Sequence, residues 1–151
     1  MKFESFAKSC IPYGHTVQVD GKNYLTDGRA FMLIPNTIGT IGKVYKDDGL
    51  LYNILLDSEL PTRFADLIDA KLPRPNSKGS EIIRVYGDDY NIVNIPNDLF
   101  GKIERADACI IVKYWTVEDE EQHFALLVGH PTKDIENFEA TGIILDMEDS
   151  Y

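Results

Sequence analysis

Apolar and polar residues alternate along most of the chain, and this period of two is typical of antiparallel β-strands. The pairs Asp20-Gly21 and Asp27-Gly28 each separate two apolar runs. Such pairs predict tight hairpin turns, because glycine readily takes the positive φ that these turns require. The expected strands are His15–Val19, Asn23–Thr26, Arg29–Ile34, Val44–Tyr45, Leu51–Leu56, Glu81–Tyr86, Tyr90–Ile95, Cys109–Val117, His123–Gly129 and Gly142–Met147.

Three other segments change to the spacing of three and four residues that indicates an amphipathic helix. They cover residues 2–10, residues 61–72 after the helix-starting Pro61, and residues 98–105 after Asn97, a suitable N-terminal cap. The inward positions would be Phe3, Phe6, Ala7, Cys10, Phe64, Leu67, Ile68, Leu72, Leu99, Phe100 and Ile103. Many strands with about three short helices between them predict an α+β fold, built mainly on antiparallel sheet.

The length of 151 residues and the hydrophobic fraction of 44% indicate one folded domain over residues 1–151 and exclude a disordered chain. One stretch resembles a linker, Pro73–Ser80, which is rich in proline and polar residues. We expect it to form an exposed loop or a joint between two halves of the domain.

The chain lacks the sequence marks of membrane insertion and export. No apolar run approaches the roughly 20 residues of a membrane-spanning helix, and the start MKFESFAKSC has no signal-peptide core. Two cysteines, Cys10 and Cys109, are too few for a disulfide scaffold. We therefore expect a reduced cytoplasmic protein that has no contact with a membrane.

Negative charge is concentrated in the last third of the chain. The whole sequence holds 15 Lys and Arg against 25 Asp and Glu, a net charge of −10. Residues 1–106 carry a net charge of −1, whereas residues 107–151 carry −9. This segment is an ordinary solvated surface, a surface that binds a basic partner, or a surface that repels nucleic acid from the wrong side of the molecule. The acidic residues of such a partner surface would be Glu118, Asp119, Glu120, Glu121, Asp146, Glu148 and Asp149.

No motif for catalysis, a metal or a cofactor stands out. The stretch Gly39–Val44 has only two residues between its glycines, and Val44 follows Lys43 where a phosphate-binding loop needs Ser or Thr. Neither the three histidines nor the two cysteines have the spacing of a zinc site or of an activated nucleophile. We expect no cofactor, no metal and no locally encoded catalytic site, which leaves an enzyme with a non-local site as one alternative.

Positive residues flank the three expected helices. If these helices share one face, that face presents cations to DNA while the acidic strands lie elsewhere. The alternative is ordinary helix-surface charge, because acidic residues lie on the same elements. The candidate DNA-facing residues are Lys2, Lys8, Arg63, Lys71, Lys102 and Arg105.

Two stretches resemble a domain of the bacterial DNA polymerase sliding clamp, the beta subunit. Val17–Pro35 has a strand, a tight turn and then Thr-Asp-Gly-Arg leading into an apolar strand, and Ile92–Val128 has a strand, Ile-Pro, a helix and two alternating strands. The resemblance implies a clamp-like α+β fold whose helices face DNA. The bacterial clamp chain has three such domains, so a chain with one could surround DNA only as a ring of several copies.

The sequence thus favours a non-enzymatic binding protein with a clamp-like fold, acting in DNA metabolism through protein or DNA contacts, self-association included. The alternative is an acidic inhibitor, of DNA-mimic type, that occupies a basic surface of a nuclease, toxin or other partner.

Overall fold

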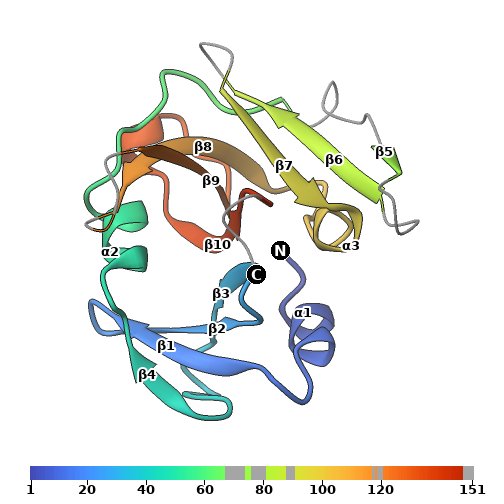
Figure 1. Cartoon of the computed structure of the whole chain (residues 1–151), viewed down its shortest axis with the longest axis vertical. Coiled ribbons are helices and arrows are strands. Elements are labelled where there is room, and N and C mark those ends of the chain that lie inside the picture. Colours follow the sequence, from blue (N-terminus) through green and yellow to red (C-terminus); the bar gives the residue numbers. More distant parts are fainter. Residues whose placement is uncertain (67–73, 76–80, 88–90, 117, 119–120, 148–151) are drawn as a thin grey trace.

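The structure is a computed structural model, and it describes residues 1–66, 74–75, 81–87, 91–116, 118 and 121–147. Figure 1 shows their arrangement. The helices are α1 (Phe3–Ser9), α2 (Leu50–Leu55), α3 (Asn97–Phe100) and the 3₁₀ turn η1 (Ile135–Asn137). The strands are β1 (His15–Val19), β2 (Lys22–Thr26), β3 (Ala30–Leu33), β4 (Val44–Lys46), β5 (Arg74–Pro75), β6 (Glu81–Tyr86), β7 (Ile92–Pro96), β8 (Ala108–Trp115), β9 (Gln122–Gly129) and β10 (Ala140–Leu145).

Seven strands form one curled sheet in the order β4-β1-β2-β3-β10-β9-β8, and β5-β6-β7 form a second, smaller sheet. Every pairing is antiparallel except that of β4 with β1. The expected α+β fold with mainly antiparallel sheet is therefore confirmed. In the part of the chain that the structure describes, no helix is long and apolar enough to cross a membrane.

The large sheet contains the same unit twice. In each unit a helix precedes three consecutive antiparallel strands: α1 precedes β1-β2-β3, and α3 precedes β8-β9-β10. The last strands of the two units, β3 and β10, pair antiparallel with Phe31 opposite Ile143. The order β1-β2-β3-β10-β9-β8 is consequently symmetric about an approximate two-fold axis between β3 and β10.

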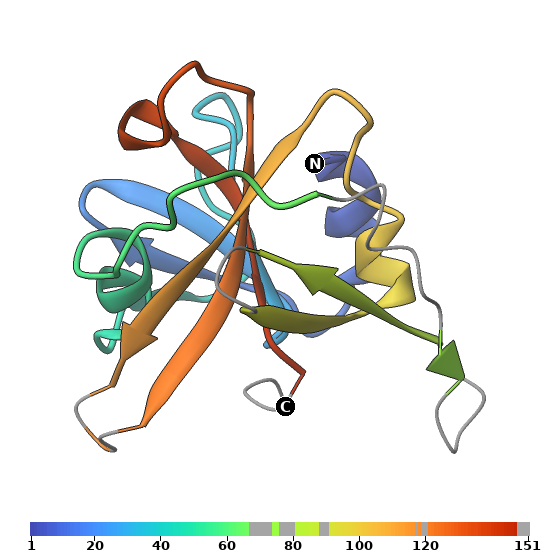
Figure 2. The same cartoon turned by 90° about the horizontal axis from the view of Figure 1, so that it is seen from above.

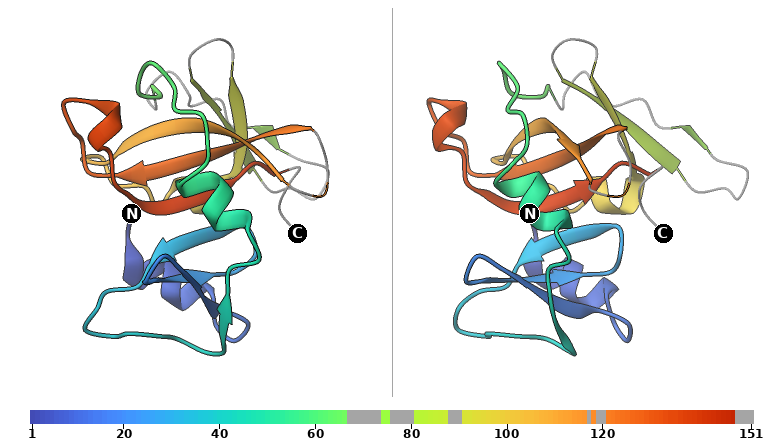
Figure 3. Two further views of the ribbon diagram at one scale, coloured as in Figure 1. Left: turned by 90° about the vertical axis from the view of Figure 1, so that its left-hand side faces the viewer. Right: turned by 60° about the vertical axis from the view of Figure 1, so that its left-hand side comes forward.

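Both faces of the large sheet are buried. On the convex face Leu25, Ile111 and Leu126 belong to a core that also includes Phe6 of α1 and Leu99 of α3, together with β6 and β7. On the concave face the alternate residues pack against α2. Figure 3 looks toward the side that α2 covers, with α2 in front of the large sheet. Double burial explains the continuous apolar runs of β8, β9 and β10, since strands covered on both sides need no polar face.

The strand expected over Leu51–Leu56 is wrong, because this segment forms helix α2. Both carboxylate oxygens of Asp47 accept hydrogen bonds from the first turn, at 2.9 Å from the backbone N–H groups of Leu51 and Tyr52. Leu51 and Ile54, three residues apart, are fully buried in the concave core. A six-residue apolar segment fits both the period of a strand and that of a helix. Here the cap by Asp47 and the packing against the concave face of the sheet favour the helix.

Two predicted helices also need correction. Residues 61–66, the described part of the helix expected over 61–72, are not helical, and the rest lies outside the described residues. The helix expected over 98–105 is α3, and it ends at Phe100. Asn97 lies inside α3 and makes no side-chain cap, because Pro96 occupies the capping position.

The other expected elements are present with small shifts at their ends. The N-terminal helix, the meander β1-β2-β3, the hairpin of β6 with β7 and the three strands β8, β9 and β10 all form. Asp20 and Gly21 both have positive φ, at 50° and 74°, as the expected tight turn between β1 and β2 requires. Of the linker-like stretch 73–80, the structure describes only β5.

Candidate functional site

Helices α1 and α3 lie side by side on the convex face of the large sheet (Figure 2). The backbone N–H of Lys2 donates to the carbonyl of Lys102 at 2.9 Å, just after α3. The N-terminal amine of Met1 donates to the Asp107 carboxylate at 2.6 Å in a partly buried contact, and only 4% of the Asp107 side chain is exposed. These contacts fix the first residues of the chain beside the turn that leads into β8.

Four of the six predicted DNA-facing cations lie in or next to this pair of helices: Lys8 is in α1, Lys2 precedes it, and Lys102 and Arg105 follow α3. Lys2, Lys8 and Arg105 are exposed, and Lys102 is half-buried. The ammonium group of Lys2 lies 3.5 Å from the carbonyl oxygen of Gly101. We call the surface formed by these four residues together with Glu4, Asp98 and Glu104 the α1/α3 face.

The other two cations are not brought to this face. Arg63 lies in a non-helical segment, and its guanidinium donates to the carbonyl of Gly87 at the end of β6 at 2.7 Å. Lys71 lies outside the described residues. Helix α2 carries no cation and packs on the opposite, concave face of the sheet. The expectation that three positive helices share one face therefore holds for α1 and α3 alone.

The α1/α3 face carries both signs of charge. Glu4 and Glu104 are exposed beside the four cations. The charges of Asp98 and Asp107 are partly balanced, because Asp98 pairs with Arg29 and Asp107 with the Met1 amine. The face has more unpaired cations than unpaired acids, which sets it apart from a chain with a net charge of −10.

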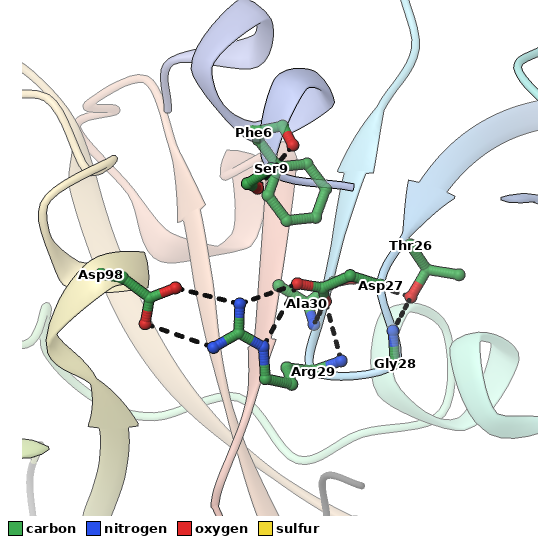
Figure 4. A network of polar contacts seen from close by, with 8 residues as sticks. All are labelled: Phe6, Ser9, Thr26, Asp27, Gly28, Arg29, Ala30 and Asp98. Carbon is green, nitrogen blue, oxygen red and sulfur yellow. Dashed lines mark hydrogen bonds and ion pairs between the residues drawn. The ribbon is translucent and has the colours of Figure 1, made fainter. Parts of the chain in front are cut away.

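The segment Thr26–Ala30 forms a turn that is closed by its own side chains (Figure 4). The Thr26 hydroxyl donates to the carbonyl of Ala30 at 2.8 Å, and one oxygen of Asp27 accepts the backbone N–H groups of Arg29 and Ala30 at 2.9 and 3.1 Å. Gly28 supplies a positive φ of 92° between them. The turn aims the Arg29 side chain toward α3.

Arg29 then joins this turn to α3. Its guanidinium donates to both oxygens of Asp98, at 3.2 and 3.0 Å, and to Asp27 at 3.2 and 2.9 Å. Partial burial would lower the pKa of Arg29, but the hydrogen bonds to Asp98 and Asp27 outweigh burial and raise that pKa. Burial would likewise raise the pKa of Asp98, but Arg29, assisted by Lys102, holds that pKa below its ordinary value.

This network was not among the predicted site residues. Thr-Asp-Gly-Arg was treated as a hairpin signature, and the partner of Arg29 lies 69 residues further along the chain. The hairpin pattern predicts the turn itself, because Asp and Gly set its backbone. No local pattern reports a contact that depends on how the two halves of the sheet meet.

The acidic residues of the last third do not form one described surface. Glu118 and Glu121 are exposed at the turn between β8 and β9, whereas Glu136 and Glu139 are exposed in the connection between β9 and β10. These places lie at opposite ends of β9 (Figure 2), which, at about 3.3 Å per residue, is roughly 25 Å long.

None of the other five predicted acidic residues adds a described position to the exposed surface at Glu118 and Glu121. Asp146 is half-buried and accepts the backbone N–H of Asn94 at 2.9 Å, so it joins the end of β10 to β7. Asp119, Glu120, Glu148 and Asp149 lie outside the described residues. The described acidic residues of the last third therefore lie in separate places and do not form one continuous acidic surface.

Chemically reactive groups are few in the described structure. Among the described residues, no cluster of three or more His, Cys, Asp and Glu side chains could hold a metal ion. Burial raises the pKa of Cys10 to about 11 and that of Cys109 to about 12, with Asp27 and Asp107 as the respective secondary causes. Both thiols are therefore neutral at physiological pH and behave as small apolar core residues.

Three of the hollows between described residues open near the concave side of the sheet. The two larger ones, of about 560 and 370 Å³, both include Lys46 and Asp47 at the end of β4. The third, of about 170 Å³, is lined mainly by apolar residues such as Tyr24, Leu55 and Leu127.

Comparisons with protein-family models, with curated proteins and with solved structures gave no significant match to this chain.

Proposed function

We propose that this chain is a non-enzymatic binding protein with a clamp-like fold, and that it contacts DNA through the α1/α3 face. The observation that carries the proposal is the repeated unit of one helix and three antiparallel strands, whose two helices lie side by side on one face of a shared sheet. The resemblance of Val17–Pro35 and Ile92–Val128 to sliding-clamp domains points to the same kind of architecture.

The charges of the α1/α3 face support contact with a polyanion. Lys2, Lys8, Lys102 and Arg105 come from two segments almost 100 residues apart and are brought together by the packing of α1 against the turn after α3. Phosphate contacts of this kind are additive and do not depend on base sequence, so the proposal implies weak, sequence-tolerant association. Because Glu4 and Glu104 lie on the same face, we expect association only at low ionic strength.

The charge of the rest of the molecule is compatible with this arrangement. The exposed acids of the β8–β9 turn and of the β9–β10 connection belong to other parts of the sheet. They would repel DNA from those parts and favour approach by the α1/α3 face.

A pair of charge-reversal variants with equal net charge tests the proposal. Lys8→Glu combined with Arg105→Glu changes the α1/α3 face, and Lys22→Glu combined with Lys133→Glu makes the same net change at exposed lysines elsewhere. Retention of a short DNA duplex at low salt should be lost in the first variant and kept in the second. Equal loss in both variants, or no retention of DNA by the unaltered protein, would overturn the proposal.

A further inference from the structure

One edge of the seven-stranded sheet is open and the other is covered. At the β8 edge the backbone of Glu59 exchanges two hydrogen bonds with Lys113, at 2.8 and 3.2 Å, and Ala65 donates to Cys109 at 2.8 Å. At the opposite edge, no described strand pairs with the outer side of β4. All three residues of β4 are exposed, with 45% exposure for Val44 and 50% for Tyr45.

The backbone geometry of β4 fixes which groups point outward. The carbonyl of Lys43 accepts the N–H of Thr16 at 2.8 Å, and the N–H of Asp47 donates to the carbonyl of Gln18 at 2.9 Å. Hydrogen bonds of a parallel ladder use alternate residues, so Tyr45 faces β1. The N–H and C=O groups of Val44 and Lys46 consequently point away from the sheet.

We propose that β4 pairs with β4 of a second copy of this chain, antiparallel and about a two-fold axis at Tyr45. In this register Val44 of each copy lies opposite Lys46 of the other, and the four outward N–H groups meet four carbonyls. A register centred on Val44 or on Lys46 would form only half of these bonds. The backbone alone therefore selects the axis at Tyr45.

The sequence of the edge complements itself in this register. Lys43 of each copy lies opposite Asp47 of the other, which places a cation beside an anion twice in the interface. The two Tyr45 residues form a non-hydrogen-bonded pair, the kind in which cross-strand side chains approach most closely. Lysine at a sheet edge usually discourages pairing. In this register each Lys43 gains an opposite charge, whereas each Lys46 lies opposite Val44.

Exposed apolar side chains flank the start of β1, beside this edge. Ile11 and Tyr13, in the segment before β1, are 76% and 90% exposed, and Ile38 is 51% exposed. The loop that contains Ile38 is held beside β1, because the Thr16 hydroxyl donates to the carbonyl of Ile41 at 2.7 Å and accepts its N–H at 2.8 Å. A second copy at β4 would shield part of this surface, which supplies a hydrophobic contribution beyond the backbone bonds.

The pairing goes beyond the proposed function and does not depend on it, because β4 lies at the far edge from α3 and β8. An isologous contact about a two-fold axis closes on itself and gives a dimer.

A single cysteine at the axis tests the pairing. The Cα atoms of a non-hydrogen-bonded pair lie about 4.5 Å apart, within the range that a disulfide spans. Tyr45→Cys should therefore form a disulfide-linked dimer under mild oxidation, on the order of tenfold faster than Tyr52→Cys, whose parent residue on α2 is equally exposed. The native Cys10 and Cys109 are buried and do not compete.

A second variant separates edge pairing from chance collision. Val44→Pro removes an outward N–H that the ladder with β1 does not use, so it should leave the fold intact and abolish cross-linking of Tyr45→Cys. Equal cross-linking of Tyr45→Cys and Tyr52→Cys would overturn the proposal. The proposal would also be overturned if the unaltered protein sedimented with the monomer mass of 17.1 kDa at every concentration. This holds even if an added extended peptide binds the β4 edge.

Discussion

Arg29 and Asp98 face each other in a two-pronged ion pair, with guanidinium nitrogens 3.2 and 3.0 Å from the two carboxylate oxygens. Arg29 follows the β2–β3 turn of the first repeated unit, and Asp98 lies in the helix of the second. The pair therefore links the two halves of the large sheet, in addition to the pairing of β3 with β10.

Removal of Arg29 should destabilise the protein more than removal of Asp98. Asp98 is 54% exposed, so Asp98→Ala should lower the free energy of unfolding by about 1 kcal/mol or less. Arg29→Ala also leaves Asp27, which is only 13% exposed, without its partner. Urea unfolding compares the two variants, with Glu4→Ala as the control for an exposed acid. Equal effects of Arg29→Ala and Asp98→Ala would contradict the role given to Asp27.

The same pair makes stability depend on acid pH. Arg29 holds the pKa of Asp98 below its ordinary value of 3.8 in the folded protein, although burial opposes this. The unfolded chain thus takes up a proton first, so the contribution is complete above pH 3.8 and is lost as the pH falls through the folded pKa. Asp98→Asn should reduce the acid-induced loss of stability that pH-dependent urea unfolding measures. If the free energy of unfolding of Asp98→Asn fell with acid pH as steeply as that of the unaltered protein, this would contradict the pairing of Arg29 with Asp98.

Most strands were predictable because their own residues carry the pattern, either a turn sequence at the end or an apolar run along the strand. The Asp-Gly turns fixed the meander β1-β2-β3, and the continuous apolar runs of β8, β9 and β10 fitted buried strands. Segment 51–56 was not predictable in the same way, because its six apolar-rich residues fit two periods and the concave sheet decides between them. In the α1/α3 face, the helical pattern of residues 2–10 places Lys8, whereas Lys102 and Arg105 lie beyond the end of α3 and not on the longer helix that was expected. The contact of Arg29 with Asp98 depends on long-range packing.

Substitutions in α2 test whether this segment is a helix, as in the structure, or a strand, as the sequence suggested. In the helix Leu51 and Ile54 are fully buried and Tyr52 is 52% exposed. Leu51→Ala and Ile54→Ala should each lower the free energy of unfolding by about 2–5 kcal/mol, and Tyr52→Ala by about 0.5 kcal/mol or less. In a strand, Tyr52 and Ile54 would share a face. Similar losses for Tyr52→Ala and Ile54→Ala in denaturant unfolding would therefore contradict the helix.

The ion pair of Met1 and Asp107 should be costly to break. Only 4% of the Asp107 side chain is exposed, and the same Asp107 oxygen that accepts the Met1 amine also accepts the N–H of Glu104 at 2.8 Å. Asp107→Ala removes both of these hydrogen bonds and should lower the free energy of unfolding by about 1–3 kcal/mol. Glu136→Ala, at an exposed acid of η1, is the matched control and should change it little. Equal unfolding midpoints for the two variants would show that the pair adds no stability.

The two cysteines should be inert in the folded protein. Burial raises the pKa of Cys10 to about 11 and that of Cys109 to about 12, so neither forms a thiolate near neutral pH. A thiol-specific reagent should label neither residue until denaturant is added, and Tyr45→Cys supplies an exposed thiol as the positive control. Rapid labelling of Cys109 in the native protein would contradict its place in the convex core.

The salt dependence of DNA association tests the proposed function most directly. A plot of the logarithm of the association constant against the logarithm of salt concentration has a slope of about −0.9 for each phosphate that the protein neutralises on duplex DNA. The account predicts a negative slope for the unaltered protein, and a slope nearer zero by about 2 when Lys8 and Arg105 are both changed to Gln. A slope unaffected by these two changes, or no measurable association at low salt, would contradict DNA contact through the α1/α3 face.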